Sequence, residues 1–151
     1  MTRQESFGLL HRIRDELDAG RFALARVLAD LYRDAGVYQA ARIDGVTGEE
    51  LKRCARNLEI TFVLRLFAEF EAILRNFWLH GVGKATEPEM RVLMESIGRR
   101  RGMSDEDLAH AHEIRKYRND IIHENLRNAR FAFPECLRIL GLFLRWLRLQ
   151  W

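Results

Sequence analysis

Two side chains near residue 120 carry groups that could act together on a phosphate. The segment "IRKYRNDIIHEN" (114–125) places Arg118 five residues before His123. An imidazole exchanges protons near neutral pH, and a guanidinium donates paired hydrogen bonds to phosphate oxygens. Five residues correspond to about 140° around a regular helix, so the two side chains point in different directions. They could address one phosphate only through the reach of the arginine, a local distortion of the helix, or the pairing of two chains.

Arg118 lies among the apolar residues of its predicted helix. At about 100° per residue, six apolar residues fall on one side, which should pack against the rest of the protein. These residues are Leu108, Ala111, Ile114, Tyr117, Ile121 and Ile122. Arg118 falls near the middle of that side, and burial of an unpaired guanidinium is strongly unfavourable. Either the side is not wholly buried, or an acid or a bound anion meets Arg118; a structural salt bridge is the alternative to a catalytic role.

His123 lies on an adjoining polar stripe of the same helix. Asn119 is four residues earlier and faces the same way, so its amide could help to position the reacting groups. A solvated histidine with no chemical role is the other interpretation of His123. Spacing alone does not separate the two.

Two glutamates of a long upstream helix are candidate partners for Arg118. Glu69 falls among apolar residues, one turn after Arg65, and Glu71 lies on a more polar side, one turn before Arg75. The helical angle favours Glu69 as the more embedded acid, and we keep both. A Glu69–Arg65 ion pair within the helix is the alternative account of Glu69.

The elements that must position these residues are all predicted to be helices. Only two prolines occur in 151 residues, and long runs are rich in Leu, Ala, Arg and Glu. We expect a single domain over residues 1–151, folded as an up-and-down bundle of about five or six helices with one long central helix.

Several local signals set the expected helix boundaries. We expect a first helix over about residues 3–18, a break or kink at "DAG" (18–20), and a second helical piece that ends at about residue 33. Further helices are expected over about residues 48–79, from 86 to "GRRRG" (98–102), from 104 through the motif, and from 134 onward. Residues 38–50 are expected to be a loop, and "NLRNARFAFP" (125–134) an interruption. Capping boxes are predicted at Thr47–Glu50 and Thr86–Glu89, with Pro88 in the first helical turn.

Composition bounds the possible partners and compartment. The net charge is +3 and the sequence pI about 9.2, which permits a polyanionic partner without requiring one. Cys54 and Cys136 form no CxxC pair and suit a reducing cytosol as buried thiols. The apolar stretch "CLRILGLFLRWLRLQW" is interrupted by arginines and too short to span a membrane. No signal peptide, metal-ligand spacing or nucleotide-binding motif is visible, so we expect a cytoplasmic protein without a cofactor.

The motif and its context resemble the HEPN domains. "RNDIIH" (118–123) is similar to their R-x(4–6)-H motif, with a polar residue after the arginine, as Asn119 is here. "LFAEFEAILRNF" (66–77) resembles the helix that carries an acidic residue ahead of that motif, where Glu71 matches best by local pattern. The order of a long helix, a connector, a motif helix and a closing helix also fits.

This resemblance implies a helical bundle that often dimerises and brings two motifs into one cleft. Many HEPN domains are metal-independent endoribonucleases of toxin–antitoxin, phage-defence or RNA-processing systems, so RNA, a second copy and an antitoxin or other protein are the implied partners. Arg118 and His123 match the catalytic pair and Asn119 the polar position. The residue types suit the reaction, since histidine can move protons and arginine can stabilise a phosphorane.

The same resemblance leaves two other functions open. Some HEPN domains are non-catalytic modules that bind RNA or proteins, and an unrelated helical adaptor would explain the Arg and His as coincidence. In the toxin branch whose antitoxin is a nucleotidyltransferase, a tyrosine follows two residues after the histidine. Asn125 stands at that position here, which argues against membership of that branch.

Overall fold

The computed structural model describes residues 1–123 and 131–151 and confirms the predicted all-α bundle. The described residues form α1 (Arg3–Arg33), α2 (Ala35–Ile43), α3 (Gly48–Asn76), the π-helical turn η1 (Phe77–Gly81), α4 (Met90–Arg101), α5 (Asp105–Ile122) and α6 (Phe133–Arg145). Together α3 and η1 form the predicted long helix. Asn125 and most of the segment 125–134 lie outside the described residues.

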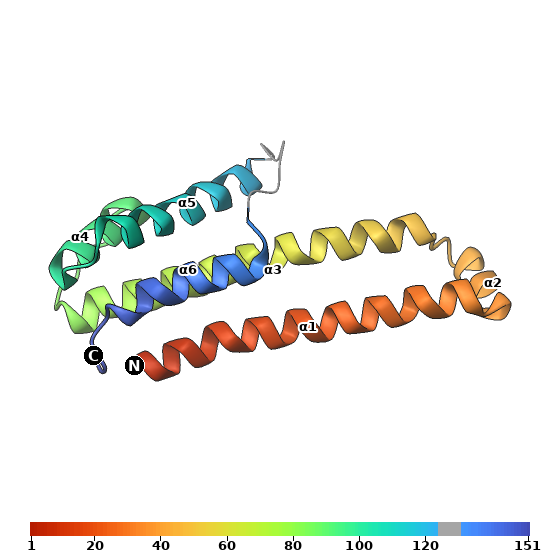
Figure 1. Cartoon of the computed structure of the whole chain (residues 1–151), viewed down its shortest axis with the longest axis horizontal. Helices are drawn as coiled ribbons and strands as arrows, with labels where there is room; N and C mark the ends of the chain where they lie inside the picture. The colour runs from red at the N-terminus through yellow and green to blue at the C-terminus, as the bar shows by residue number, and fades with distance from the viewer. Residues whose placement is uncertain (124–130) are drawn as a thin grey trace.

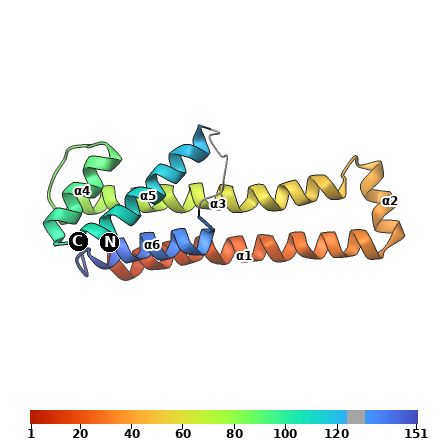
Figure 2. The same ribbon diagram turned by 45° about the horizontal axis from the view of Figure 1, so that its top comes forward.

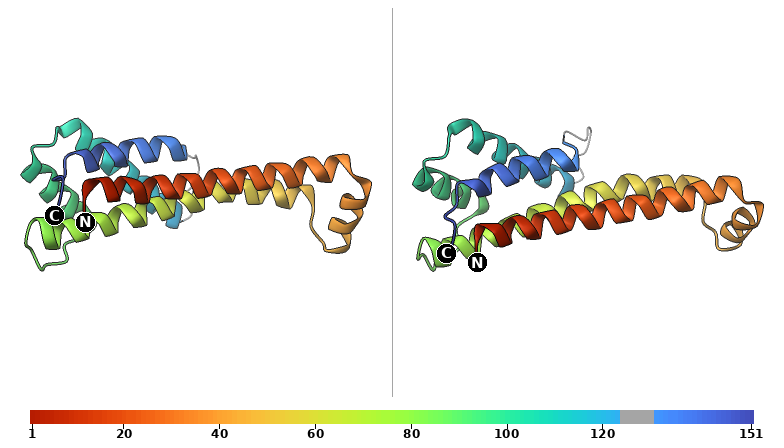
Figure 3. Two further views of the ribbon diagram at one scale, coloured as in Figure 1. Left: turned by 90° about the horizontal axis from the view of Figure 1, so that it is seen from below. Right: turned by 60° about the horizontal axis from the view of Figure 1, so that its bottom comes forward.

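Helices α1 and α3 run antiparallel as a long hairpin that α2 closes at one end (Figure 1). Helix α6 lies along the half of this hairpin that is farthest from α2, and α4 and α5 pack over the same half (Figure 2). The two chain ends meet there, where Arg3 donates its backbone N–H to the carbonyl of Leu149 at 3.0 Å. The bundle therefore occupies one end of the molecule, and the hairpin extends beyond it as an arm (Figure 3).

The core of the bundle is aromatic and centres on α3. Phe70 is fully buried and meets Phe143 of α6 edge-on, with ring centroids 5.3 Å apart. Phe67 lies 5.9 Å from Phe70 and is also buried. In the arm, by contrast, Leu31 is the one buried side chain among the described side chains of residues 20–57. Most of the hydrophobic stabilisation is therefore confined to the bundle.

The predicted break at "DAG" is wrong, because α1 continues without interruption through Gly20. A Cβ on Gly20 would lie 3.2 Å from a methyl carbon of Leu58 on α3. The glycine therefore permits close approach of two helices, and packing outweighs its low helix propensity.

The predicted loop 38–50 is mostly wrong. Asp34 caps a further helix, α2, by accepting hydrogen bonds from the backbone N–H groups of Gly36 and Val37 at 2.8 and 3.3 Å. Only residues 44–47 connect it to α3. The Thr47–Glu50 capping box is confirmed, with both reciprocal hydrogen bonds present.

The second predicted capping box is also wrong. Helix α4 begins at Met90, and Thr86 instead accepts a hydrogen bond from the indole N–H of Trp78 at 3.1 Å. Pro88 precedes the helix, and its carbonyl accepts a 3.4 Å hydrogen bond from Arg75. The Thr86 hydroxyl thus accepts a hydrogen bond from Trp78 and does not cap the helix as the local pattern predicts. The helix starts expected near residues 104 and 134 are confirmed, with Ser104 as the N-cap of α5 and Pro134 in the first turn of α6.

The two cysteines differ from each other. Cys136 is buried, and burial raises the pKa of its thiol to about 12. Cys54 is exposed on the arm, so its prediction as a buried thiol is wrong. No helix in the described ranges has the length and apolar character needed to cross a membrane.

The contrast between bundle and arm predicts that the same substitution lowers the free energy of unfolding more in the bundle than in the arm. Phe70→Ala should lower the free energy of unfolding by about 3–5 kcal/mol, because it leaves a cavity in the core. Phe22→Ala is the matched control, since Phe22 is 76% exposed on the arm, and it should change stability by less than about 0.5 kcal/mol. Urea denaturation followed by circular dichroism measures both. Equal losses would contradict the assignment of the core.

Candidate functional site

Helix α5 presents a narrower apolar side than the sequence predicts. Ala111, Ile114, Tyr117 and Ile121 are buried, whereas Ile122 is 48% exposed. The centre of the packed side therefore lies about 40° from Arg118 around the helix axis, and Arg118 itself is only half-buried. The side is not wholly buried, and this removes the need for a buried acid beside the arginine.

Two neighbours hold the Arg118 guanidinium. Its Nη1 donates a hydrogen bond to Oδ1 of Asn119 at 3.0 Å, and its Cζ lies 5.7 Å from the ring centroid of Phe67 on α3. A cation over an aromatic face is attracted to the ring, but the ring does not neutralise its charge. Among the described residues no carboxylate forms an ion pair with Arg118. A guanidinium has five N–H donors, so several remain available to an anion.

His123 is the first residue after α5 and is exposed. Its backbone N–H donates to the carbonyl of Asn119 at 3.0 Å, which closes the last turn of the helix. Because α5 is regular up to Ile122, His123 stays about 140° from Arg118 around the axis. A local distortion within the described helix therefore does not bring the two side chains together.

The structure does not bring either candidate glutamate to Arg118. Glu71 pairs with Arg75, with Nη2 and Nε of the arginine 2.6 and 2.9 Å from the same carboxylate oxygen. Arg65 pairs with Glu16 of α1, so the predicted Glu69–Arg65 ion pair is wrong. Glu69 is half-buried and has no ion pair within the described part of the chain. On α3 the contact with Arg118 is made by Phe67, one turn before Glu71.

A second polar cluster lies earlier on α5, where sequence reasoning assigned no role. His112 has its Nε2 4.0 Å from Oε1 of Glu95 on α4, and Arg91 donates to the same oxygen at 2.9 Å. Both ring nitrogens of His112 are buried and have no hydrogen-bond partner in the described structure, and the same is true of the Nε of Arg115. Burial lowers the pKa of His112, and the charge of Arg115 lowers it further. The polar stripe of α5 was visible in the sequence, but the approach of α4 was not.

We compared the chain with protein-family models, curated proteins and solved structures, and none matches it. The resemblance to HEPN domains therefore rests on the motif and the helix order. Among residues 1–123 and 131–151, no three His, Cys, Asp or Glu side chains cluster as a candidate metal site.

The lowered pKa of His112 predicts a pH dependence of stability. The unfolded chain binds this proton more readily than the folded chain, so the stability present above about pH 6.5 falls as the pH drops below that value. His112→Asn should flatten the fall in melting temperature between about pH 7.5 and about pH 5.5. His110→Asn is the matched control, because His110 is exposed on the same helix. Parallel pH profiles for the parent and both variants would contradict this prediction.

Proposed function

We propose that this protein is a HEPN-like, metal-independent endoribonuclease that acts as a homodimer. The proposal rests on how Arg118 is held. Asn119 and Phe67 orient its guanidinium, and the side chain is half-buried. No carboxylate among the described residues neutralises its charge. His123 is exposed at the end of the same helix. An oriented cation and a proton-transfer group are the two parts that phosphoryl chemistry requires, and within one chain α5 presents them in different directions. Toxin–antitoxin, phage-defence or RNA-processing systems of the cytoplasm are the proposed context, with an antitoxin or other protein as a possible partner.

The chemistry needs only the RNA and these side chains. The RNA 2′-oxygen attacks the adjacent phosphorus while a histidine takes the 2′-hydroxyl proton. The bond from phosphorus to the 5′-oxygen breaks, and that oxygen receives a proton from the imidazolium, which leaves a 2′,3′-cyclic phosphate and a 5′-hydroxyl. Arg118 would donate to the phosphorane oxygens, where negative charge accumulates.

The geometry of α5 supports the proposal of a dimer. One chain offers a single motif histidine, and α5 is regular up to Ile122, so His123 faces away from Arg118. A second chain would supply both a second histidine and a different direction of approach. The exposed side chain of Ile122 lies within the motif and would be covered in such a dimer. Isologous contact would place two motifs at one interface.

The alternative is a non-catalytic HEPN-like module that binds RNA or a protein. The arm favours this alternative, because Phe22 and Tyr32 are 76% and 67% exposed there. Exposed aromatic side chains are typical of protein-interaction surfaces. In that case Arg118 would be a structural or binding residue with no effect on cleavage.

Cleavage of total cellular RNA in the presence of EDTA tests the proposed activity. His123→Ala and Arg118→Ala should each slow cleavage by at least about 100-fold, the scale of a lost proton-transfer or oxyanion group. His110→Ala is the matched control, since this exposed histidine lies two or more turns from the motif, and it should cleave as the parent does. Circular dichroism and sedimentation establish that every variant folds and assembles like the parent. If the parent and both motif variants behave alike, the binding module becomes the better account.

Mixing the two inactive variants tests whether the motifs act across chains. If each site takes Arg118 from one chain and His123 from the other, a heterodimer of Arg118→Ala with His123→Ala contains one intact site. With random exchange, about one quarter of the parental activity should return. If heterodimers form, as shown by differently tagged chains, and no activity returns, the pairing across chains is wrong.

A further inference from the structure

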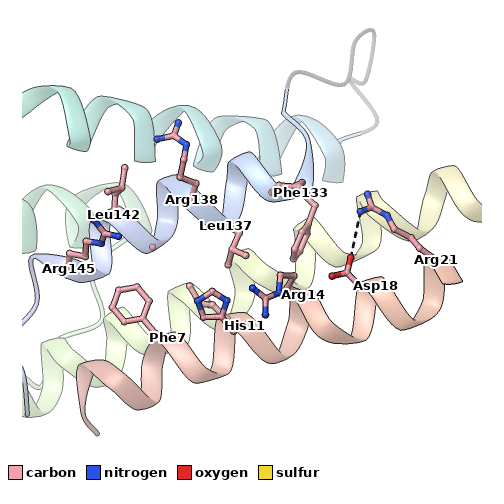
Figure 4. Close-up of a pocket in the computed structure, with 13 residues that line it drawn as sticks. Phe7, His11, Arg14, Asp18, Arg21, Phe133, Leu137, Arg138, Leu142 and Arg145 are labelled. Carbon is pink, nitrogen blue, oxygen red and sulfur yellow. Dashed lines mark ion pairs between the residues drawn. The ribbon is translucent and has the colours of Figure 1, made fainter.

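A groove of about 320 Å³ separates α1 from α6, away from the motif on α5. The two helices run antiparallel along it, and basic side chains from both line it (Figure 4). His11, Arg14 and Arg21 come from α1, and Arg138 and Arg145 come from α6. Asp18 is the single acid in the lining. The groove therefore has a strong excess of positive charge.

The charge is not evenly available along the groove. Arg14 contacts Asp15 at 2.7 Å, and Arg21 contacts Glu59 at 2.8 Å. Arg138 and Arg145 are exposed and make no ion pair with any described residue. The α6 wall thus carries two guanidinium groups that have no carboxylate partner among the described residues. Arg138 extends from α6 on the side away from α1 (Figure 4), so it would meet an anion at the rim of the groove.

The spacing of these arginines selects the shape of the anion. Arg138 and Arg145 are seven residues apart, which is two helical turns or about 10.5 Å along the axis. Arg14 and Arg21 repeat the same spacing on the opposite wall. Two separate anionic groups can each pair with one arginine of a wall at this spacing, so a polyanion matches the wall better than a single phosphate does.

The apolar part of the groove distinguishes among extended polyanions. Phe7 and Leu137 point between the two helices (Figure 4) and are half-buried. A nucleic-acid strand has bases that can pack on such a surface while its phosphates meet arginines, and this combination is typical of single-strand binding. The Asp and Glu side chains of an acidic peptide supply charge but no ring, whereas every nucleotide supplies both a phosphate and a base.

We propose that the α1–α6 groove is a second RNA-binding surface, which holds a single strand through Arg138 and Arg145 outside the candidate active site. The choice of RNA rests on the proposed function. The groove holds the substrate and takes no part in the cleavage step. Its loss should therefore weaken the binding of long RNA and leave the cleavage of a very short RNA unchanged.

Fluorescence anisotropy with a single-stranded 2′-O-methyl RNA of about 20 nucleotides tests the groove, because this probe spans several base-binding positions and lacks the attacking hydroxyl. Arg138→Gln with Arg145→Gln should weaken binding at least about tenfold and reduce the slope of log K against log salt by about 1.4, or about 0.7 for each lost phosphate contact. Arg12→Gln with Arg33→Gln removes the same charge from exposed positions of α1 outside the groove and should change both quantities far less.

The outcomes separate this inference from the proposed function. If the parent binds the probe through the groove but cleaves no RNA, the groove stands and the nuclease proposal fails. If the parent cleaves RNA while the groove variant binds with parental affinity and salt slope, the groove is wrong and the nuclease stands. Equal losses in both double variants, or equal displacement of the probe by polyglutamate, would overturn the groove as an RNA surface.

Discussion

The packing of aromatic side chains around Phe70 is the interaction on which the rest of this structure depends. Helices α1, α4, α5 and α6 all pack against α3, and Phe70 is fully buried where α6 crosses it. Phe67, its neighbour on α3, contacts both Phe70 and the guanidinium of Arg118. The core therefore continues directly into the candidate site, and the position of Arg118 depends on how α5 packs on α3.

Helix boundaries were predictable where the signal was local. Thr47 and Glu50 form their capping box with each other, so the sequence contains everything that the cap needs. Thr86 and Glu89 have the same spacing, but Trp78 donates to the Thr86 hydroxyl, and no local pattern reports that competition. Gly20 is similar: its helix-breaking tendency is visible in the sequence, whereas the Leu58 side chain that packs against it is not.

The site was predictable in part for the same reason. Helical periodicity placed Arg118 near an apolar surface. It left two possibilities, an incompletely buried surface or an acid or anion at Arg118, and the structure shows the first. The partners come from other elements: an aromatic ring in place of a glutamate at Arg118, and Glu16 of α1 in place of Glu69 at Arg65. The α1–α6 groove joins segments more than 100 residues apart, so no spacing rule could have indicated it.

The choice of an aromatic partner for Arg118 has a chemical consequence. A carboxylate would saturate the guanidinium with short, charge-assisted hydrogen bonds and would have to be displaced before a phosphate could bind. A ring attracts the cation from one face and leaves the N–H edges free. The Asn119 amide fixes the orientation through a single neutral acceptor. Arg118 is thus held in place by contacts that leave several of its N–H donors without a carboxylate partner among the described residues. Any anion that bound these donors in the folded state alone would in turn stabilise the fold.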